Sequence, residues 1–279
     1  MIVLLIHVIL GVKERKQKRN ESMKRIDFEH GTITGNILGT ALPMLVAQIL
    51  SLLYNIVDRI YIARIPEVGT TALGAVGLCF PIIVIITAFS NLFGSGGAPL
   101  FSINRGKGNT KKAETIMNTS FSMMCICGVV LMVIGMLSAS PILVLFGASE
   151  EGLSYAYPYM MIYLIGTVPS MIATGMNPFI NAQGYATTGM ISVAIGAIAN
   201  IVLDPILIFA LNMGIEGAAI ATVISQCMSA IFVLYILRKR TEYKIRFVRK
   251  NEFKSVMEKA GIKGIILDYP DLVRDANKK

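Results

Sequence analysis

Six long, mostly apolar stretches constrain what this sequence of 279 residues can fold into. They occupy residues 38–63, 72–101, 115–146, 153–180, 186–211 and 214–237. Each is long enough to cross a hydrocarbon core near 30 Å, for which a helix needs roughly 20 residues. Two exceed that length enough to predict a tilt or a break. Only helices and closed barrels satisfy their backbone in lipid, and long stretches without alternation predict helices.

Composition separates a membrane bundle from a large soluble core. Hydrophobic residues make up 54% and charged residues 15% of the chain, whereas soluble domains carry about 25% charged residues. A helix on a soluble protein shows a polar face at every turn, and most of these stretches show none. We therefore predict an all-α integral membrane protein, a bundle of six transmembrane helices whose immediate partner is the lipid bilayer.

The basic residues predict the orientation of this bundle. The net charge is +9. Lys and Arg gather at the N-terminus, after the second stretch and after the sixth: Lys13, Arg15, Lys16, Lys18, Arg19, Lys24, Arg25, Arg105, Lys107, Lys111, Lys112, Arg238, Lys239, Arg240, Lys244, Arg246, Arg249 and Lys250. The loops after the first, third and fifth stretches carry Glu67, Glu150, Glu151 and Glu216, with Arg64 as their only base. This positive-inside signature predicts a plasma-membrane protein with both termini in the cytoplasm, and it argues against nucleic acid as a partner.

The same pattern divides the chain into three parts. Residues 1–37 form a basic N-terminal segment, residues 38–237 the transmembrane lobe, and residues 238–279 a basic and polar tail. Residues 1–12 are apolar but too short to span, and their basic run follows them, unlike that of a secretory signal. Met23 is a second candidate for the translation start. Residues 253–267 could form a short amphipathic helix.

Nothing in the pattern predicts an enzyme or a resident metal site. The four cysteines fall inside apolar stretches, form no Cys-x-x-Cys pair and are expected to stay free: Cys79, Cys125, Cys127 and Cys227. No His-Glu-x-x-His pattern occurs. The glycine-rich run 93–98 lacks the Gly-Lys-Ser/Thr end of a phosphate-binding loop. We expect no catalytic residue and no cofactor.

Two acidic residues inside the apolar stretches are the strongest functional candidates. An ionised Asp at mid-membrane costs at least about 2.5–3.5 kcal/mol, so Asp58 and Asp204 are expected to face a cavity or a partner. The alternative is an acid near a helix end that reaches headgroup water. At 1.5 Å per residue, both acids lie about 8–10 Å inside the outer ends of their spans, and Thr222 lies about 12 Å inside. Asn200 lies one turn deeper, so these four side chains could converge.

The first stretch carries a polar stripe. Steps of three or four residues place its polar side chains and one methionine on a single face: Met44, Gln48, Ser51, Tyr54, Asn55 and Asp58. The opposite face is aliphatic. An amphipathic helix inside a membrane turns its polar side toward the bundle interior or water. The stripe therefore predicts a polar cavity.

The fifth stretch suggests what the acids could bind. Asn200 and Asp204 are four residues apart and share a helical face, beside Pro205, which favours a kink. Asn200 could alternatively serve only as an interhelical hydrogen bond. Carboxylate, amide and hydroxyl oxygens suit Na⁺, and a desolvated carboxylate suits a proton. The predicted site binds Na⁺ or H⁺ in one conformation and releases it in another, with Na⁺ held transiently by Asp58, Asn200 and Asp204.

Several motifs resemble those of bacterial multidrug and toxic compound extrusion (MATE) transporters. Residues 53–59 (LYNIVDR) followed by 72–77 (ALGAVG) are similar to the first-helix region of that family. Residues 200–205 (NIVLDP) with 217–222 (GAAIAT) also resemble it, and residues 95–99 (SGGAP) and the basic loop 106–109 (GKGN) fit the same branch. The resemblance extends over residues 23–250, and the order and spacing of the motifs make it specific.

The resemblance implies an antiporter that exchanges Na⁺ or H⁺ for amphipathic, often cationic drugs by alternating access. It implies a cation-coupling site in an N-terminal lobe, formed by Asp58, Asn200, Asp204 and Thr222. It also implies a substrate cavity that includes Asn177, to which the polar stripe adds Gln48, Tyr54 and Asn55.

MATE transporters have two six-helix lobes with the substrate path between them, and this sequence resembles the first lobe alone. Alternating access needs a second half, so the expected partners are a drug and either a second lobe or a second copy of the chain. The chain could also be a truncated product. A flippase for lipid-linked precursors and a non-transporting membrane fragment are the alternatives. The flippase would need a basic cavity for an anionic headgroup, and the stretches offer only Arg59.

Overall fold

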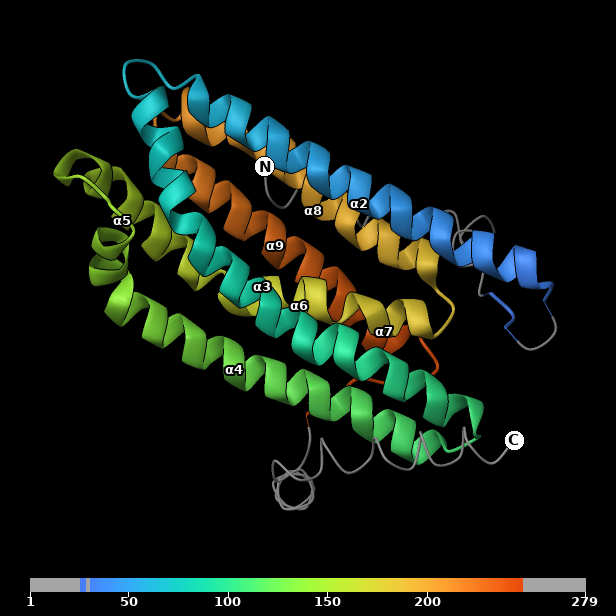
Figure 1. Ribbon diagram of the computed structural model, residues 1–279. Coiled ribbons are helices and arrows are strands. Elements are labelled where there is room, and N and C mark those ends of the chain that lie inside the picture. Colours follow the sequence, from blue (N-terminus) through green and yellow to red (C-terminus); the bar gives the residue numbers. More distant parts are fainter. Residues whose placement is uncertain (1–25, 29–30, 248–279) are drawn as a thin grey trace.

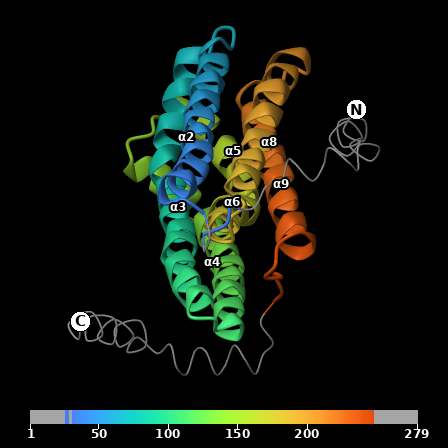
Figure 2. The ribbon, with the colours of Figure 1, turned by 90° about the vertical axis from the view of Figure 1, so that its right-hand side faces the viewer.

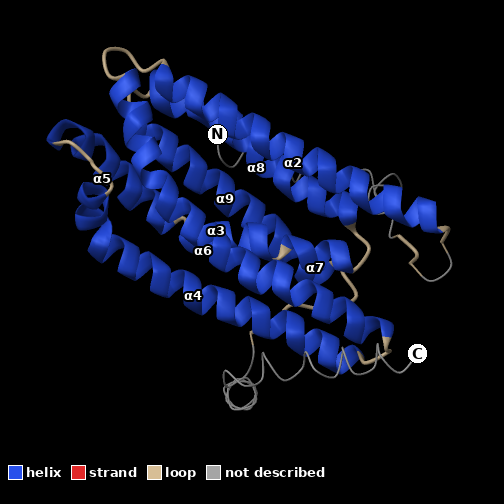
Figure 3. Cartoon of the chain, in the orientation of Figure 1, coloured by secondary structure: helices blue, strands red, loops and turns tan. Residues whose placement is uncertain are grey.

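A computed structural model describes residues 26–28 and 31–247 of the chain. All regular structure in that part is helical, and Figure 3 contains no strand. The elements are α2 (Ile33–Ala63), α3 (Gly69–Gly106), α4 (Thr110–Leu145), α5 (Glu150–Ile165), α6 (Thr167–Gly175), α7 (Asn177–Ala182), α8 (Ala186–Pro205), the π-helix η2 (Ile206–Ala210) and α9 (Gly214–Lys239). The prediction of an all-α membrane bundle is confirmed. The predictions for residues 1–12, Met23 and residues 253–267 lie outside the described residues.

The described residues contain six candidate spans when one broken span is counted. Five helical segments are each long and apolar enough to cross a membrane, and the pair Glu150–Ile165 and Thr167–Ala182 passes the same test together, bent by 57°. The sequence predicted one helical span over residues 153–180, and the structure divides this span into three helices. Pro169 and Pro178 have no N–H to donate to the carbonyls of Ile165 and Thr174. The helix accordingly breaks at Gly166 and again at Met176.

Several helices begin earlier than the apolar stretches that predicted them. The side chains of Thr32, Asn109 and Ser149 accept hydrogen bonds from backbone N–H groups in the first turns of α2, α4 and α5. Such N-caps stabilise a helix start regardless of hydrophobicity. Consequently α2 begins at Ile33 rather than at residue 38. The two longest stretches, within α3 and α4, run without a break.

The helices form three layers across the bundle. The α3–α4 hairpin and the α8–α9 hairpin lie on opposite sides, and the broken span α5–α7 lies between them (Figures 1 and 2). Helix α2 runs along α8. One end of the bundle carries the α3–α4 loop, the α7–α8 loop and the end of α9 (Figure 1). We call it the basic end, because Lys107, Lys111, Lys112 and Lys239 are located there.

Burial is unevenly distributed over the spans. In the most apolar part of α9, 39% of the residues are buried inside the bundle, whereas none are buried in the most apolar part of α2. Large apolar side chains of α2 such as Leu42, Leu52 and Ile56 are exposed. A soluble protein of this size rarely exposes such an area. The exposed faces therefore match hydrocarbon or another apolar surface.

Candidate functional site

A cavity of about 490 Å³ opens between α2, α3, α6, α7, α8 and α9. The stripe on α2 supplies one wall of it, because Met44, Gln48, Ser51 and Tyr54 line the cavity. The remaining walls are mainly hydroxyls and carboxamides: Thr87, Asn91, Ser95, Ser170, Thr174, Asn177, Asn181, Asn200, Thr222, Ser225, Gln226 and Ser229. None of the residues that line it is charged. The cavity therefore presents hydrogen-bonding groups without a fixed charge of its own.

A buried polar cluster borders this cavity. Asp204 on α8 is fully buried, and Asn200, one turn before it, is 2% exposed. The Asn200 side-chain Nδ2 donates to Asp204 Oδ1 at 3.1 Å and lies 3.4 Å from Thr222 Oγ1 on α9. Asn200 and Thr222 also line the cavity. The cluster is thus connected to the cavity through these two side chains.

Asp58 completes the cluster from α2. Its carboxyl group lies close enough to that of Asp204 for the two groups to interact. Because α2 runs along α8, two carboxyl groups 146 positions apart in sequence meet inside the lobe. The prediction that Asp58, Asn200, Asp204 and Thr222 could converge agrees with this arrangement. Their role in cation coupling stays a prediction.

Three oxygens of this cluster have no hydrogen-bond donor. Asp58 Oδ1, Asp204 Oδ2 and Asn200 Oδ1 are buried and unpaired among the described residues. Buried acceptors without a donor are costly, and each one in a folded protein calls for an explanation. Arg59, the next residue after Asp58, is exposed and lies over the Phe80 ring at 5.6 Å from its centroid. Binding of a proton or Na⁺ by these oxygens stays a prediction.

The other end of the cavity is lined by carboxamides. Asn177 Nδ2 lies 2.7 Å from Ser192 Oγ and 2.9 Å from the Gly189 carbonyl, and Asn181 Nδ2 donates to Asn177 Oδ1 at 3.2 Å. Asn181 Oδ1 has no partner. Both asparagines belong to α7, next to the basic end. The broken span therefore brings polar side chains to the end of the cavity that lies nearest the basic end of the bundle.

Of the predicted cavity residues, Gln48, Tyr54 and Asn177 line the cavity, whereas Asn55 does not. The side chain of Asn55 is exposed and donates to the carbonyl of Ser51 in its own helix at 2.7 Å. Such back-bonding satisfies the amide locally. Sequence reasoning missed Asn181 and Gln226. Asn181 follows Asn177 by four residues, a spacing that could have indicated it.

The described residues hold no group of three or more His, Cys, Asp or Glu side chains suited to a transition metal. The polar cluster is instead an arrangement of carboxylate, amide and hydroxyl oxygens.

Comparison with known proteins places these observations in a family. The MatE family model matches residues 43–206. The chain is 28% identical over 244 residues to the multidrug export protein MepA of Staphylococcus haemolyticus (strain JCSC1435), covering 86% of this chain and 54% of that protein. It is 25% identical over 244 residues to MepA of Staphylococcus aureus (strain MRSA252), with the same coverage. The chain spans about half the length of the curated relatives it matches.

Solved structures give the same result. A multidrug resistance MATE family transporter of the MOP superfamily, in an outward-facing conformation, matches with a TM-score of 0.73 and 26% identity over 81% of this chain and 51% of that chain. MATE in complex with MaD3S matches with a TM-score of 0.74 and 26% identity, covering 81% of this chain and 52% of that chain.

Proposed function

The chain belongs to the MatE family, and on that premise we propose that it forms one lobe of a cation-coupled exporter of amphipathic, often cationic drugs. Members of this family are transporters rather than enzymes. The observation that carries the proposal is the cluster of three unpaired oxygens, from Asp58, Asp204 and Asn200, at the edge of a polar cavity.

The cluster and the cavity are close enough to affect each other. Asn200 and Thr222 belong to both. An ionised carboxylate attracts a cationic drug in a low-dielectric cavity, and a bound proton or Na⁺ cancels that attraction. Cation and drug therefore oppose each other at equilibrium, and this coupling is reciprocal. Such opposition is what an antiporter requires.

The lining argues against a flippase for anionic precursors. Recognition of a phosphate or pyrophosphate headgroup calls for Lys, Arg or a helix N-terminus. None of the residues that line the cavity is basic. A neutral, hydroxyl- and carboxamide-rich surface fits a drug whose positive charge is balanced by the neighbouring acids.

The basic end is proposed to face the cytoplasm. It carries Lys107, Lys111, Lys112 and Lys239, whereas the loops at the opposite end carry Glu67, Glu150 and Glu216. Basic residues are retained on the cytoplasmic side during insertion. Transport by alternating access would then use a second lobe, contributed by another polypeptide segment or by a second copy.

Binding measurements test the coupling without requiring transport. The purified full chain in lipid nanodiscs is titrated with a fluorescent cationic dye over a range of pH and Na⁺ concentration. We expect the apparent Kd of the dye to rise as one of the two cations saturates its site. Asp58→Asn and Asp204→Asn should remove that dependence, and Glu216→Gln, a change at an exposed acid, should preserve it. A dye affinity indifferent to both cations contradicts the proposal.

A further inference from the structure

The chain does not leave the bundle where α9 ends. Residues 241–247, which we call the strap, cross the basic end beneath α7, α3 and α4. Their side chains alternate, with Thr241, Tyr243 and Ile245 buried and the residues between them exposed. This is the period of an extended segment lying on a surface. The tail predicted to begin at residue 238 is thus packed against the lobe over its first part.

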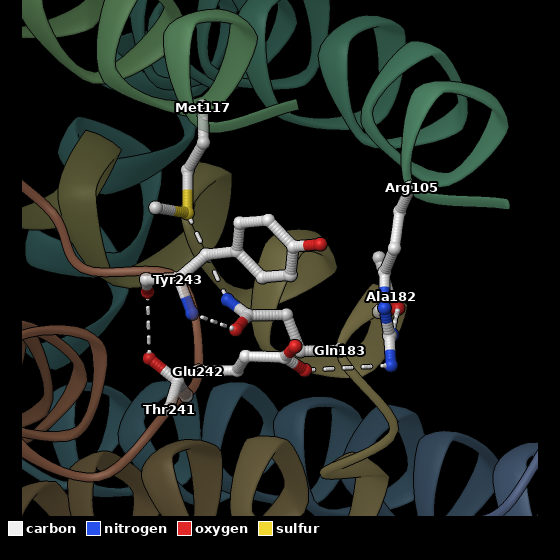
Figure 4. Close-up of polar contacts among 7 residues, drawn as sticks. All are labelled: Arg105, Met117, Ala182, Gln183, Thr241, Glu242 and Tyr243. Carbon is white, nitrogen blue, oxygen red and sulfur yellow. Dashed lines mark hydrogen bonds and ion pairs between the residues drawn. The ribbon is translucent and has the colours of Figure 1, made fainter. Parts of the chain in front are cut away.

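Two buried carboxamides hold the backbone of the strap. Gln183 and Asn118 are each 1% exposed. Gln183 Oε1, just beyond α7, accepts from the Tyr243 N–H at 3.0 Å, and Asn118 Oδ1 on α4 accepts from the Arg246 N–H at 2.8 Å. Figure 4 shows the Gln183 side chain between the strap and Met117, whose sulfur lies 3.7 Å from Gln183 Nε2. Removing the strap would leave both carboxamide oxygens without these donors, which is costly for buried acceptors.

Side chains reinforce both attachments. The Tyr243 ring packs edge-on against Phe101 of α3 at 5.0 Å between centroids. Arg105 donates to the Ala182 carbonyl at the end of α7 and forms an ion pair with Glu242 of the strap at 3.9 Å (Figure 4). Arg246 is paired with Glu114 at 3.8 Å. The strap therefore links the end of α7 to the α3–α4 hairpin.

Helix α7 depends on such ties because it is short. It has six residues and follows the break at Met176, and helices of this length are not stable on their own. Its first residue, Asn177, and its fifth, Asn181, line the cavity. The loop after α7 is also bound from the other direction, since the Ile26 N–H donates to the Gly184 carbonyl at 2.9 Å.

We propose that the strap positions α7, so that displacement of the strap is transmitted through Gln183 to Asn177 and Asn181 at the end of the cavity. Gln183 and Asn118 are positioning residues for this movement and do not contact substrate. The inference rests on the proposed transport function for its purpose, and on the contacts of the strap for its mechanism.

Thiol labelling tests the link directly. The full chain is prepared with its four cysteines replaced by Ala and with Asn181→Cys as the reporter. A membrane-impermeant maleimide is then applied at the basic end. We expect Gln183→Leu to accelerate labelling about three- to tenfold, the factor that corresponds to one net hydrogen bond. Gln183→Glu keeps an acceptor oxygen for the Tyr243 N–H and should restore a rate close to that of the parent.

A second pair of variants avoids the buried core. Arg246→Pro removes the backbone N–H that donates to Asn118 Oδ1. Arg246→Ala removes only the side chain and its ion pair with Glu114. The proline variant should label faster than the alanine variant by a similar factor, and Lys244→Gln, at an exposed position of the strap, should match the parent. Equal rates in all of these variants overturn the inference.

These labelling rates are measured without drug or coupling cation. If the dye titration fails while strap variants accelerate labelling, only the proposed function is lost. If the dye titration succeeds while labelling is unchanged, only the role of the strap is lost.

Discussion

Asp58 and Asp204 share an environment but differ in access to water. Asp204 is fully buried under α2 and α9, whereas Asp58 is partly exposed at the surface of α2. Their carboxyl groups interact, so the charge on one changes the free energy of charging the other. In the proposed function, protons or Na⁺ would therefore bind in steps that belong to the pair rather than to either residue.

This contact predicts non-additive mutants. Asp58→Asn and Asp204→Asn should each abolish most of the cation dependence of dye binding, and the double variant should add little, because the singles already disable one shared site. The measurement is a double-mutant cycle on the shift in dye Kd caused by saturating cation. Losses that multiply would mean two independent acids.

The neutral ligand in the cluster should matter less. Asn200→Ala removes one donor to Asp204 and one uncharged oxygen, so cation affinity is expected to fall about two- to tenfold, in line with a net hydrogen bond of about 0.5–1.5 kcal/mol. Cation titration of dye binding measures it. Ser225→Ala, in the same cavity wall, is the control. A complete loss of cation dependence in Asn200→Ala would show that Asn200 is as important as the acids.

At the scale of helices, a close crossing joins α3 to α6. A Cβ atom added at Gly94 would collide with the backbone of Gly175, whereas one added at Gly96 would meet nothing within 4 Å. The Ser90 hydroxyl lies 2.6 Å from that of Thr174 beside this crossing. Without a side chain at position 94, the two backbones approach closely enough for the broken span to pack between the hairpins.

The crossing predicts opposite outcomes for two similar substitutions. Gly94→Ala should destabilise the lobe by about 1–3 kcal/mol, the usual cost of overpacking. Gly96→Ala should leave stability unchanged or raise it by up to about 1 kcal/mol through helix propensity. Thermal unfolding of both variants in one detergent compares them. Equal transition temperatures would show that α3 and α6 can move apart without loss of stability.

The sequence predicted these elements well where one signal dominated. Apolar length indicated every span, and helical spacing indicated that Gln48 and Tyr54 share a face. It failed where several weak signals acted together. Pro169 and Pro178 each remove a backbone donor, but prolines also occur inside the unbroken helices α3 and α4, so their presence alone did not predict these breaks. Pro205 was expected to favour a kink, and beyond it α8 continues as the π-helix Ile206–Ala210.

Contacts between helices could not be predicted from the sequence for a different reason. Convergence of Asp58 with Asp204 depends on which helices are neighbours, and depth along each span limits this without fixing it. The strap was read as a polar tail because its alternation covers few residues. Asn55 was misplaced because its spacing fits the stripe, while its amide is satisfied by the carbonyl of Ser51.

At the scale of the whole molecule, orientation is a prediction from charge alone. Cysteine labelling at Lys107 and at Glu151, exposed residues at opposite ends of the bundle, tests it in a background without native cysteines. In intact cells, an impermeant reagent should modify Glu151→Cys and spare Lys107→Cys until the membrane is opened, because basic loops remain inside. The reverse pattern would invert the topology.

The chain spans about half the length of the matched relatives. We therefore expect residues 1–279, expressed alone in cells that lack their own exporters, to confer no resistance to cationic dyes. Alternating access requires a second half against which the lobe can move. Dye efflux by the purified chain in liposomes, driven by a Na⁺ or proton gradient, would instead indicate that two copies assemble.

The broken span also bears on how the protein is made. Helix α5 has 16 residues, about 24 Å at 1.5 Å per residue, which is less than the roughly 30 Å of a bilayer core. The segment that follows, α6 with α7, is not longer than α5. Because neither half is long enough to cross the core alone, we expect the ribosome to deliver both before the translocon releases them. Lateral exit of this segment into lipid should consequently lag behind translation, and the α3–α4 hairpin, made earlier, is available to receive it.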